Sequence, residues 1–170
     1  MHDTRSNDIF YILDQIRKLH YEKKVSVFYV DYIQLIGVKG SKEGRTNDTG
    51  RVARELKNIA KELDVCVNSL CQVKRNDDNP TKPPTIFDLR ASGELEEAAD
   101  NIIILHRPEA HMMNRTPDEW KGVADIEWAK GRNLGLGGWQ FGFDGKCTRF
   151  FSKQNDYKKI VSFKNGEFEY

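Results

Sequence analysis

The stretch that most constrains the fold runs from Val25 to Ile36 and reads VSVFYVDYIQLI. It is rich in β-branched and aromatic residues and contains one acid, Asp31. The run is too short to span a membrane and lacks helical spacing, so it predicts a strand buried on both faces of a mostly parallel sheet. In open α/β sheets, ligands bind at the carboxyl ends of the strands. Asp31 is therefore a candidate either for holding a cation or for capping a helix in the next loop.

Two helical patterns and a second strand surround this run. Apolar residues at helical spacing predict helices from Ile9 to Tyr21 and from Arg51 to Leu63. A second apolar strand, Val65 to Leu70, is followed by Gln72 and then by the cations Lys74 and Arg75. This β-α-β alternation predicts an α/β fold with a parallel sheet. The ends of its strands are the expected site, so Asp31 and Gln72 are its first candidates.

The segment from Gly37 to Gly50 is glycine-rich, polar and locally basic through Lys39, Lys42 and Arg45. It has nothing that could pack in a core, and it predicts a long mobile loop. Two interpretations stay open for this loop. It is a solvated linker, or its cations contact phosphate groups.

The second half of the chain predicts further strands and two hairpins. The run DLRASGELEEAADNIIIL, from Asp88 to Leu105, predicts a short helix and a third buried strand, and the polar stretch Arg107 to Trp120 predicts a surface excursion. A strand from Val123 to Ala129 leads into AKGRN and the glycine-rich LGLGG, which indicates a β-hairpin with two cations at its bend, Lys130 and Arg132. Asn165-Gly166 between apolar residues predicts a last hairpin, from Ile160 to Tyr170.

The net charge of +1 gives the whole protein no strong field, so any nucleic-acid surface must come from local clusters of cations. The three cysteines lack the spacing of metal ligands. Cys66 and Cys71 are predicted to be core thiols in a reducing compartment. The sequence shows neither a signal region nor a membrane-spanning segment, which predicts a cytosolic protein with no membrane partner.

Taken in order, four motifs resemble the C-terminal RecA-like ATPase domain of DnaB-type replicative DNA helicases, superfamily 4. VFYVDYIQLI is similar to that family's Walker B strand, and the run that ends at Gln72 is similar to the third helicase motif. DLRASG resembles the fourth motif, and AKGRNLGLGG resembles the arginine-finger hairpin. The resemblance covers most of the chain. It implies that residues 1–153 are the C-terminal portion of a RecA-like domain with β-hairpins at its end, whereas residues 154–170 form a tail.

The resemblance implies ATP and Mg²⁺ as cofactors and gives four residues catalytic roles. Asp31 would hold Mg²⁺ through its water shell, and Gln72 would sense the γ-phosphate. Lys130 and Arg132 would reach the nucleotide site of a neighbouring subunit in a hexameric ring and offset charge on the γ-phosphate in the transition state. Without the resemblance, Gln72 is better interpreted as a polar residue at a sheet edge. For the two cations, the alternative is a pair of solvated side chains beside a turn, but the adjacent hairpin glycines and buried strand favour the specific role.

The resemblance also implies single-stranded DNA as a partner. Arg90 and the backbone of Ala91 and Gly93 would contact it in the ring channel. Further candidates are the cations of the loop and of the second strand end, namely Lys39, Lys42, Arg45, Lys74 and Arg75. Such contacts reach phosphates and carry no sequence preference. The family usually has an acid where Ala91 stands, so only a backbone contact is expected there.

One motif of the family is missing from these residues. No GxxxxGK[ST] phosphate loop occurs, and the glutamate and the primase-binding domain that the family carries upstream are expected outside this sequence. The first hypothesis is a part of a replicative helicase that couples ATP hydrolysis to translocation on single-stranded DNA and duplex unwinding, active with an upstream fragment carrying the phosphate loop. The alternative is a non-catalytic RecA-like remnant that binds DNA or docks on a helicase ring. A recombinase or clock-type relative fits less well, because DLRASG followed by AKGRN is typical of the helicase branch.

Overall fold

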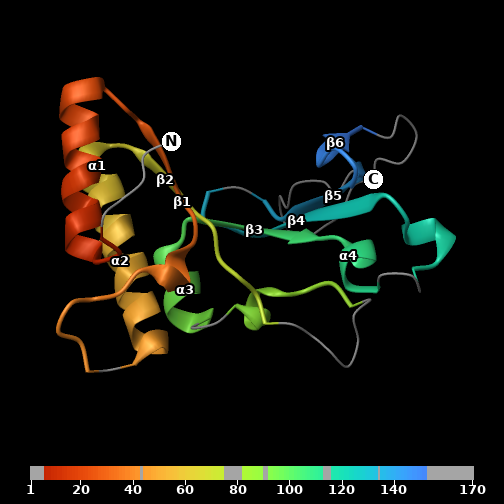
Figure 1. Cartoon of the computed structure of the whole chain (residues 1–170), viewed down its shortest axis with the longest axis horizontal. Helices are drawn as coiled ribbons and strands as arrows, with labels where there is room; N and C mark the ends of the chain where they lie inside the picture. The colour runs from red at the N-terminus through yellow and green to blue at the C-terminus, as the bar shows by residue number, and fades with distance from the viewer. Residues whose placement is uncertain are drawn as a thin grey trace. The chain divides into compact units, whose positions relative to one another are not determined.

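The computed structural model (Figure 1) describes residues 6–42, 44–74, 82–89, 92–112, 116–133 and 135–152. The chain divides into two compact units. Unit 1 comprises Met1–Val73 and Leu89–Ala99, and unit 2 comprises Lys74–Asp88 and Asp100–Tyr170. The predicted hairpin at Ile160 to Tyr170 lies outside the described residues. In the part of the chain that is described, no helix is long and apolar enough to cross a membrane.

Unit 1 has the predicted β-α-β order. Its two strands pair in parallel, with Val27 opposite Cys66 and Val30 opposite Ser69. In chain order its elements are α1 (Ile9–Lys23), β1 (Val27–Val30), the 3-10 turn η1 (Ile33–Leu35), α2 (Arg45–Leu63), β2 (Cys66–Ser69) and α3 (Ser92–Ala98). Helix α2 connects the two strands and packs against β2, α1 and α3 (Figure 1).

The first helix shows how the sequence sets these bounds. The carboxylate of Asp8 accepts hydrogen bonds from the backbone N–H groups of Phe10 and Tyr11, at 3.1 and 3.4 Å, and so caps donors that a helix start leaves unsatisfied. The helix ends where Lys24 takes a left-handed conformation, with φ of 58°. Its apolar stripe is buried, and on its exposed side Arg17 forms a two-point ion pair with Glu62 of α2, at 2.9 and 2.8 Å.

The predicted mobile loop from Gly37 to Gly50 is only partly a loop, because α2 begins at Arg45 rather than at Arg51. The expectation that nothing in this segment packs in a core was wrong, since Val38 is buried. The hydroxyl of Ser41 donates to the carboxylate of Asp48 at 2.5 Å. Asp48 lies in the first turn of α2, where the helix dipole favours an acid. The prediction missed this extension because polar residues and two glycines hid the start of the helix.

The prediction that the first strand is buried on both faces was wrong. Phe28 is buried, but Val27 and Tyr29 on the other face are 47% and 76% exposed. Helix α2 packs against this two-stranded sheet, and the described residues of unit 1 leave the alternate side chains open to solvent. Cys66 is exposed and Cys71 is half-buried, so the prediction of a core thiol was wrong for Cys66.

Unit 2 is built on an antiparallel sheet with the strand order β3-β4-β5-β6. Its strands are β3 (Asn101–His106), β4 (Val123–Gly131), β5 (Gly137–Asp144) and β6 (Arg149–Phe151), and α4 (Pro108–Met112) lies within the predicted surface excursion. The predicted hairpin of β4 and β5 is present. Strand β3 is buried on one face only, because antiparallel sheets pack on one side and alternate, so the prediction of a fully buried third strand was wrong. The short strand β6 was not predicted.

Candidate functional site

Asp31 and Gln72 lie at the same edge of the parallel sheet of unit 1. Asp31 directly follows the last residue of β1, and its side chain is exposed. Because Val30 pairs with Ser69, the chain leaves β2 beside Asp31, and Gln72 follows three residues later with an exposed side chain. Since the carboxyl ends of parallel strands are where α/β proteins bind ligands, this edge is the candidate site of unit 1.

The turn η1 joins these two strand ends through main-chain hydrogen bonds. The N–H of Leu70 donates to the carbonyl of Val30 at 2.9 Å, which extends the parallel pairing by one residue. The N–H of Ile33 donates to the carbonyl of Leu70, also at 2.9 Å. The chain that follows Asp31 is therefore fixed against the chain that precedes Gln72.

The side chain of Gln34 adds a second set of contacts between the two ends. Its amide nitrogen donates to the carbonyl of Gln72 at 2.9 Å and to the sulfur of Cys71 at 3.0 Å. Its amide oxygen accepts the N–H of Gln72 at 3.2 Å. The sequence analysis did not identify Gln34 as a site residue. The only feature of the sequence that pointed to it was its position three residues after Asp31.

Cys71 lies between Leu70 and Gln72, but it is not a candidate nucleophile. Burial raises the pKa of its thiol, and the hydrogen bond from Gln34 opposes that rise only in part. The reactive form of cysteine is the thiolate, so a raised pKa leaves Cys71 protonated at neutral pH. Its sulfur instead accepts a hydrogen bond from Gln34.

Asp31 is the residue at this edge that suits a metal. Within the described ranges, no group of three or more His, Cys, Asp or Glu residues could hold a metal ion. One carboxylate does not make a structural metal site, but it fits Mg²⁺, which binds through one or two carboxylates and takes its other ligands from water and phosphate. The donor set therefore fits magnesium that arrives with a nucleotide.

Lys130 and Arg132 lie at the end of β4 in unit 2, where the strand is irregular. Ile102 pairs with Lys130 and Ile103 pairs with Trp128, so Ala129 is an extra residue that forms a β-bulge. Bulges bend a strand and redirect the side chains that follow, and they occur beside functional sites. The predicted cations thus follow a local break in the sheet.

Arg132 is half-exposed and contacts Asp100, the residue before β3. Its N–H donates to the Asp100 carbonyl at 2.8 Å, and its guanidinium Nε lies 3.2 Å from the carboxylate. Both side chains are half-exposed, and such ion pairs contribute only about 0–1 kcal/mol. The pair holds Arg132 beside the start of β3.

Several predicted DNA contacts lie on the surface. Lys39 and Lys42 are exposed on the segment before α2, and the N–H of Lys39 is held by the carboxylate of Asp8 at 2.8 Å. Gly93 is exposed near the start of α3, and Lys74 is exposed in unit 2. Arg75, Arg90 and Ala91 lie outside the residues that the structure describes, and for Arg45 only the backbone is described.

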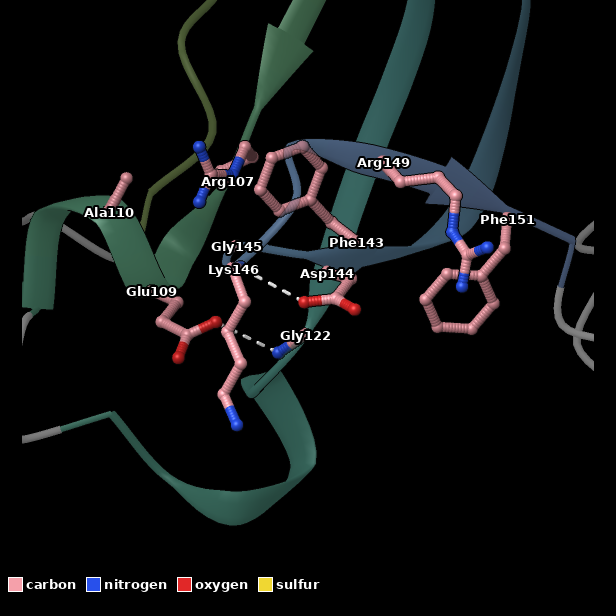
Figure 2. Close-up of a pocket in the computed structure, with 10 residues that line it drawn as sticks. All are labelled: Arg107, Glu109, Ala110, Gly122, Phe143, Asp144, Gly145, Lys146, Arg149 and Phe151. Atoms are coloured by element: carbon pink, nitrogen blue, oxygen red, sulfur yellow. Dashed lines mark hydrogen bonds between the residues drawn. The ribbon is translucent and has the colours of Figure 1, made fainter.

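Unit 2 also has a pocket of about 670 Å³ that the sequence did not indicate (Figure 2). It lies at the start of β4, next to Gly122, whereas Lys130 and Arg132 lie at the end of that strand. The guanidinium of Arg107 lies 3.6 Å from the centre of the buried Phe143 ring. The pocket is also lined by the acids Glu109 and Asp144 and by the cations Lys146 and Arg149, so its charges are mixed.

Comparison with known protein families supports the resemblance that the sequence motifs indicated. The family model described as the DnaB-like helicase C terminal domain matches residues 1–152. A probable plasmid replicative DNA helicase of Chlamydia psittaci is 33% identical over 155 residues, which are 91% of this chain and 33% of that protein. The replicative DNA helicase DnaB of Pasteurella multocida is 38% identical over 137 residues, which are 79% of this chain and 29% of that protein. The chain therefore spans about a third of the length of these curated relatives.

Two solved structures are similar to this chain. One is described as a DnaB-like replicative helicase and its interactions with primase. It matches with a TM-score of 0.77 and 28% identity, over 90% of this chain and 37% of that one. The other, described as "ATPase Domain of G40P", matches with a TM-score of 0.73 and 29% identity, over 86% of this chain and 52% of that one. These matches confirm the predicted resemblance and the predicted RecA-like α/β fold.

Proposed function

We propose that this chain, which belongs to the DnaB-like helicase C-terminal domain family, is part of a replicative DNA helicase that couples ATP hydrolysis to translocation on single-stranded DNA and to duplex unwinding. The observation that carries the proposal is the edge of unit 1 where Asp31 and Gln72 lie at adjacent ends of two parallel strands. An acid and an amide at neighbouring strand ends are the groups that a phosphate-transfer site needs on its metal side.

Each of the two residues has a distinct role at this edge. Asp31 would hold Mg²⁺ through its water shell, and the bound ion would supply positive charge beside the phosphates. Gln72 offers an uncharged amide, whose N–H donates to the γ-phosphate and whose carbonyl orients the attacking water. An amide does this without adding negative charge beside the phosphates.

Lys130 and Arg132 act on the nucleotide site of a neighbouring subunit. Two cations there offset the charge that spreads onto the γ-phosphate oxygens in the transition state. Their place after the β4 bulge supports this role, since the side chain of Arg132 is half-exposed there. The role requires an oligomer, and a hexameric ring is the assembly that we propose.

The phosphate loop is the part of the site that these residues lack. No GxxxxGK[ST] occurs in the sequence, so tight binding of the phosphates must come from a polypeptide segment with that motif. In this proposal, the chain supplies four parts of the ATPase: the acid on the metal side, the γ-phosphate sensor, the cations that act on the neighbouring subunit, and the residues that contact DNA. This division of the site leads to a direct test.

The test measures magnesium-dependent ATP hydrolysis by this chain, alone and together with the upstream segment that carries the phosphate loop. We expect no turnover by the chain alone and turnover by the assembled protein. Arg132→Ala should lower kcat by about 10³-fold or more, as for other arginine fingers. Lys121→Ala, which removes a cation just before the other end of β4, is the matched control and should leave kcat unchanged.

Two outcomes would contradict the proposal. Robust ATP hydrolysis by the chain alone would show that the missing loop is not needed. An assembled protein that binds single-stranded DNA but hydrolyses no ATP would instead support the non-catalytic remnant.

Binding of single-stranded DNA is tested by its salt dependence. If Lys39 and Lys42 contact phosphates, the plot of log affinity against log salt should have a negative slope, which becomes shallower by about 0.7 for each contact removed. The double variant with alanine at both positions is compared with Lys23→Ala, a control on the exposed end of α1. An affinity that does not respond to salt would refute the phosphate contacts.

A further inference from the structure

We propose that Gln34 is the positioning residue for Gln72, and that it holds the main chain of Gln72 so that the side-chain amide points at the γ-phosphate. This inference rests on the proposed function, because it assigns Gln34 a task in the same nucleotide site. Gln34 itself touches neither nucleotide nor metal in this scheme and acts only through Gln72.

The geometry is a two-point clamp. The amide of Gln34 receives the N–H of Gln72 at 3.2 Å and donates to the carbonyl of the same residue at 2.9 Å. A backbone residue has one N–H and one carbonyl, so this single side chain occupies both. The clamp therefore fixes the orientation of the Gln72 backbone, whereas a single hydrogen bond would leave it free to rotate about that bond.

The clamp is needed because of where Gln72 lies. Strand β2 ends at Ser69, and Gln72 follows it in irregular backbone with an exposed side chain. The last ladder bonds before it are those of Leu70, whose N–H and carbonyl meet Val30 and Ile33. Among the described residues, the main-chain hydrogen bonds to β1 and η1 end at Leu70, and the side-chain amide of Gln34 takes the place of a neighbouring strand at Gln72.

The clamp also ties the sensor to the metal-side acid. Gln34 lies in η1, three residues after Asp31, and η1 is itself anchored by Ile33 to Leu70. The spacing between Asp31 and the backbone of Gln72 is thus set within one short hydrogen-bonded turn. In a phosphate-transfer site, a displacement of about 1 Å in a positioning group can lower the rate by about 10²-fold.

The first measurement uses the 170-residue chain alone and follows hydrogen exchange of the Gln72 amide. Gln34→Met has nearly the same length and removes every hydrogen bond of the clamp. Gln34→Glu keeps an acceptor for the Gln72 N–H and loses both donors. We expect Gln34→Met to raise the exchange rate at Gln72 by about 10-fold or more, and Gln34→Glu to raise it less. Leu35→Ala, in the same turn, is the control and should leave the rate at Gln72 unchanged.

The second measurement uses the assembled protein with its phosphate-loop segment. Gln34→Met should lower kcat by about 10- to 100-fold and change KM by less than about 3-fold, because positioning of a sensor acts on the transition state. The double variant Gln34→Met with Gln72→Ala should be no slower than Gln72→Ala alone. A residue that acts only through another shows such non-additivity, whereas a residue with a general structural role adds its own loss.

The outcomes separate this inference from the proposed function. If the wild-type assembly hydrolyses ATP and Gln34→Met does not lower kcat, or if the double variant loses more than Gln72→Ala, the positioning role is wrong and the proposed function stands. Unchanged exchange at Gln72 in Gln34→Met would also overturn the clamp. If the wild-type assembly hydrolyses no ATP, the proposed function itself fails, and the positioning role fails with it.

Discussion

Gly50 in the first half of α2 is the position where the structure makes the sharpest prediction about stability. It is buried against α3, and a Cβ atom placed there would lie 2.8 Å from the Cβ of Glu94 and would overlap the Glu94 carboxylate. Alanine is normally favoured over glycine inside a helix, by about 1 kcal/mol. The question is whether the overlap outweighs this gain.

The structure indicates that the overlap wins. The carboxylate of Glu94 can swing away, which breaks its 2.9 Å ion pair with Arg54 and costs about 0–1 kcal/mol for this half-exposed pair. The Cβ of Glu94, however, is fixed to the backbone of α3, so α3 must move away from α2. Overpacking of this kind costs about 1–3 kcal/mol. After the gain in helix propensity is subtracted, we expect Gly50→Ala to destabilise unit 1 by up to about 3 kcal/mol.

Urea unfolding of the chain checks this value. The long helices α1 and α2 belong to unit 1, so ellipticity at the helix band reports on that unit, whereas tryptophan fluorescence reports on unit 2, which holds all three tryptophans. Gly93→Ala is the matched control, since its Cβ would meet nothing within 4 Å, and it should be neutral or slightly stabilising. Stabilisation by Gly50→Ala of about 1 kcal/mol would refute the argument, because it would show that α3 packs against α2 without needing this glycine.

Two further predictions concern an ion pair of unit 1 and an aromatic side chain of unit 2. The hydrogen bond from Arg17 lowers the pKa of Glu62. The ionised Glu62 therefore stabilises the fold fully above the ordinary glutamate pKa of about 4.3, and this stabilisation is lost as the pH falls from there through the lowered pKa. Glu62→Gln should flatten this acid-side loss in urea unfolding, and an unchanged pH profile would contradict it. Phe143→Ala should destabilise unit 2 by about 3–5 kcal/mol, because the ring is buried, lies edge-on to Phe150 at 4.9 Å and stacks with Arg107. Phe143→Leu keeps most of the volume and should cost less than about 2 kcal/mol, as read by tryptophan fluorescence.

Sequence reasoning found the parts of unit 1 whose signals are local. Apolar spacing located α1, and the order of strand, helix and strand predicted that Asp31 and Gln72 end neighbouring parallel strands. These predictions succeed because periodicity and strand direction follow from the chain itself. The start of α2 was misplaced because glycine and polar residues are weak helix signals, and no side chain of the N-cap residue, Gly44, marks that boundary.

What the sequence could not show depends on contacts between distant residues. The apolar composition of Val27 and Tyr29 predicts burial, but burial depends on which layers cover the sheet. The clamp of Gln34 on Gln72 joins residues 38 positions apart and has no periodic signature. The pocket around Phe143 likewise forms only when Arg107 and the end of β5 meet. Each of these features depends on which distant residues the fold brings together, so the sequence alone could not predict it.

If the proposed function holds, the chemistry of Asp31 requires that the metal and the nucleotide bind together at this site. Asp31 is a single exposed carboxylate at a strand end. Solvent and salt screen its one negative charge, so its attraction for a free cation is weak. Mg²⁺ keeps several of its waters and loses them reluctantly, so one carboxylate does not compete well for the free ion. The phosphates of ATP supply the additional oxygen ligands and charge. In the proposed function, affinity for magnesium would therefore come mainly from the nucleotide complex, and Asp31 would set the orientation of that complex. The proposed clamp on Gln72 would then affect turnover more than binding.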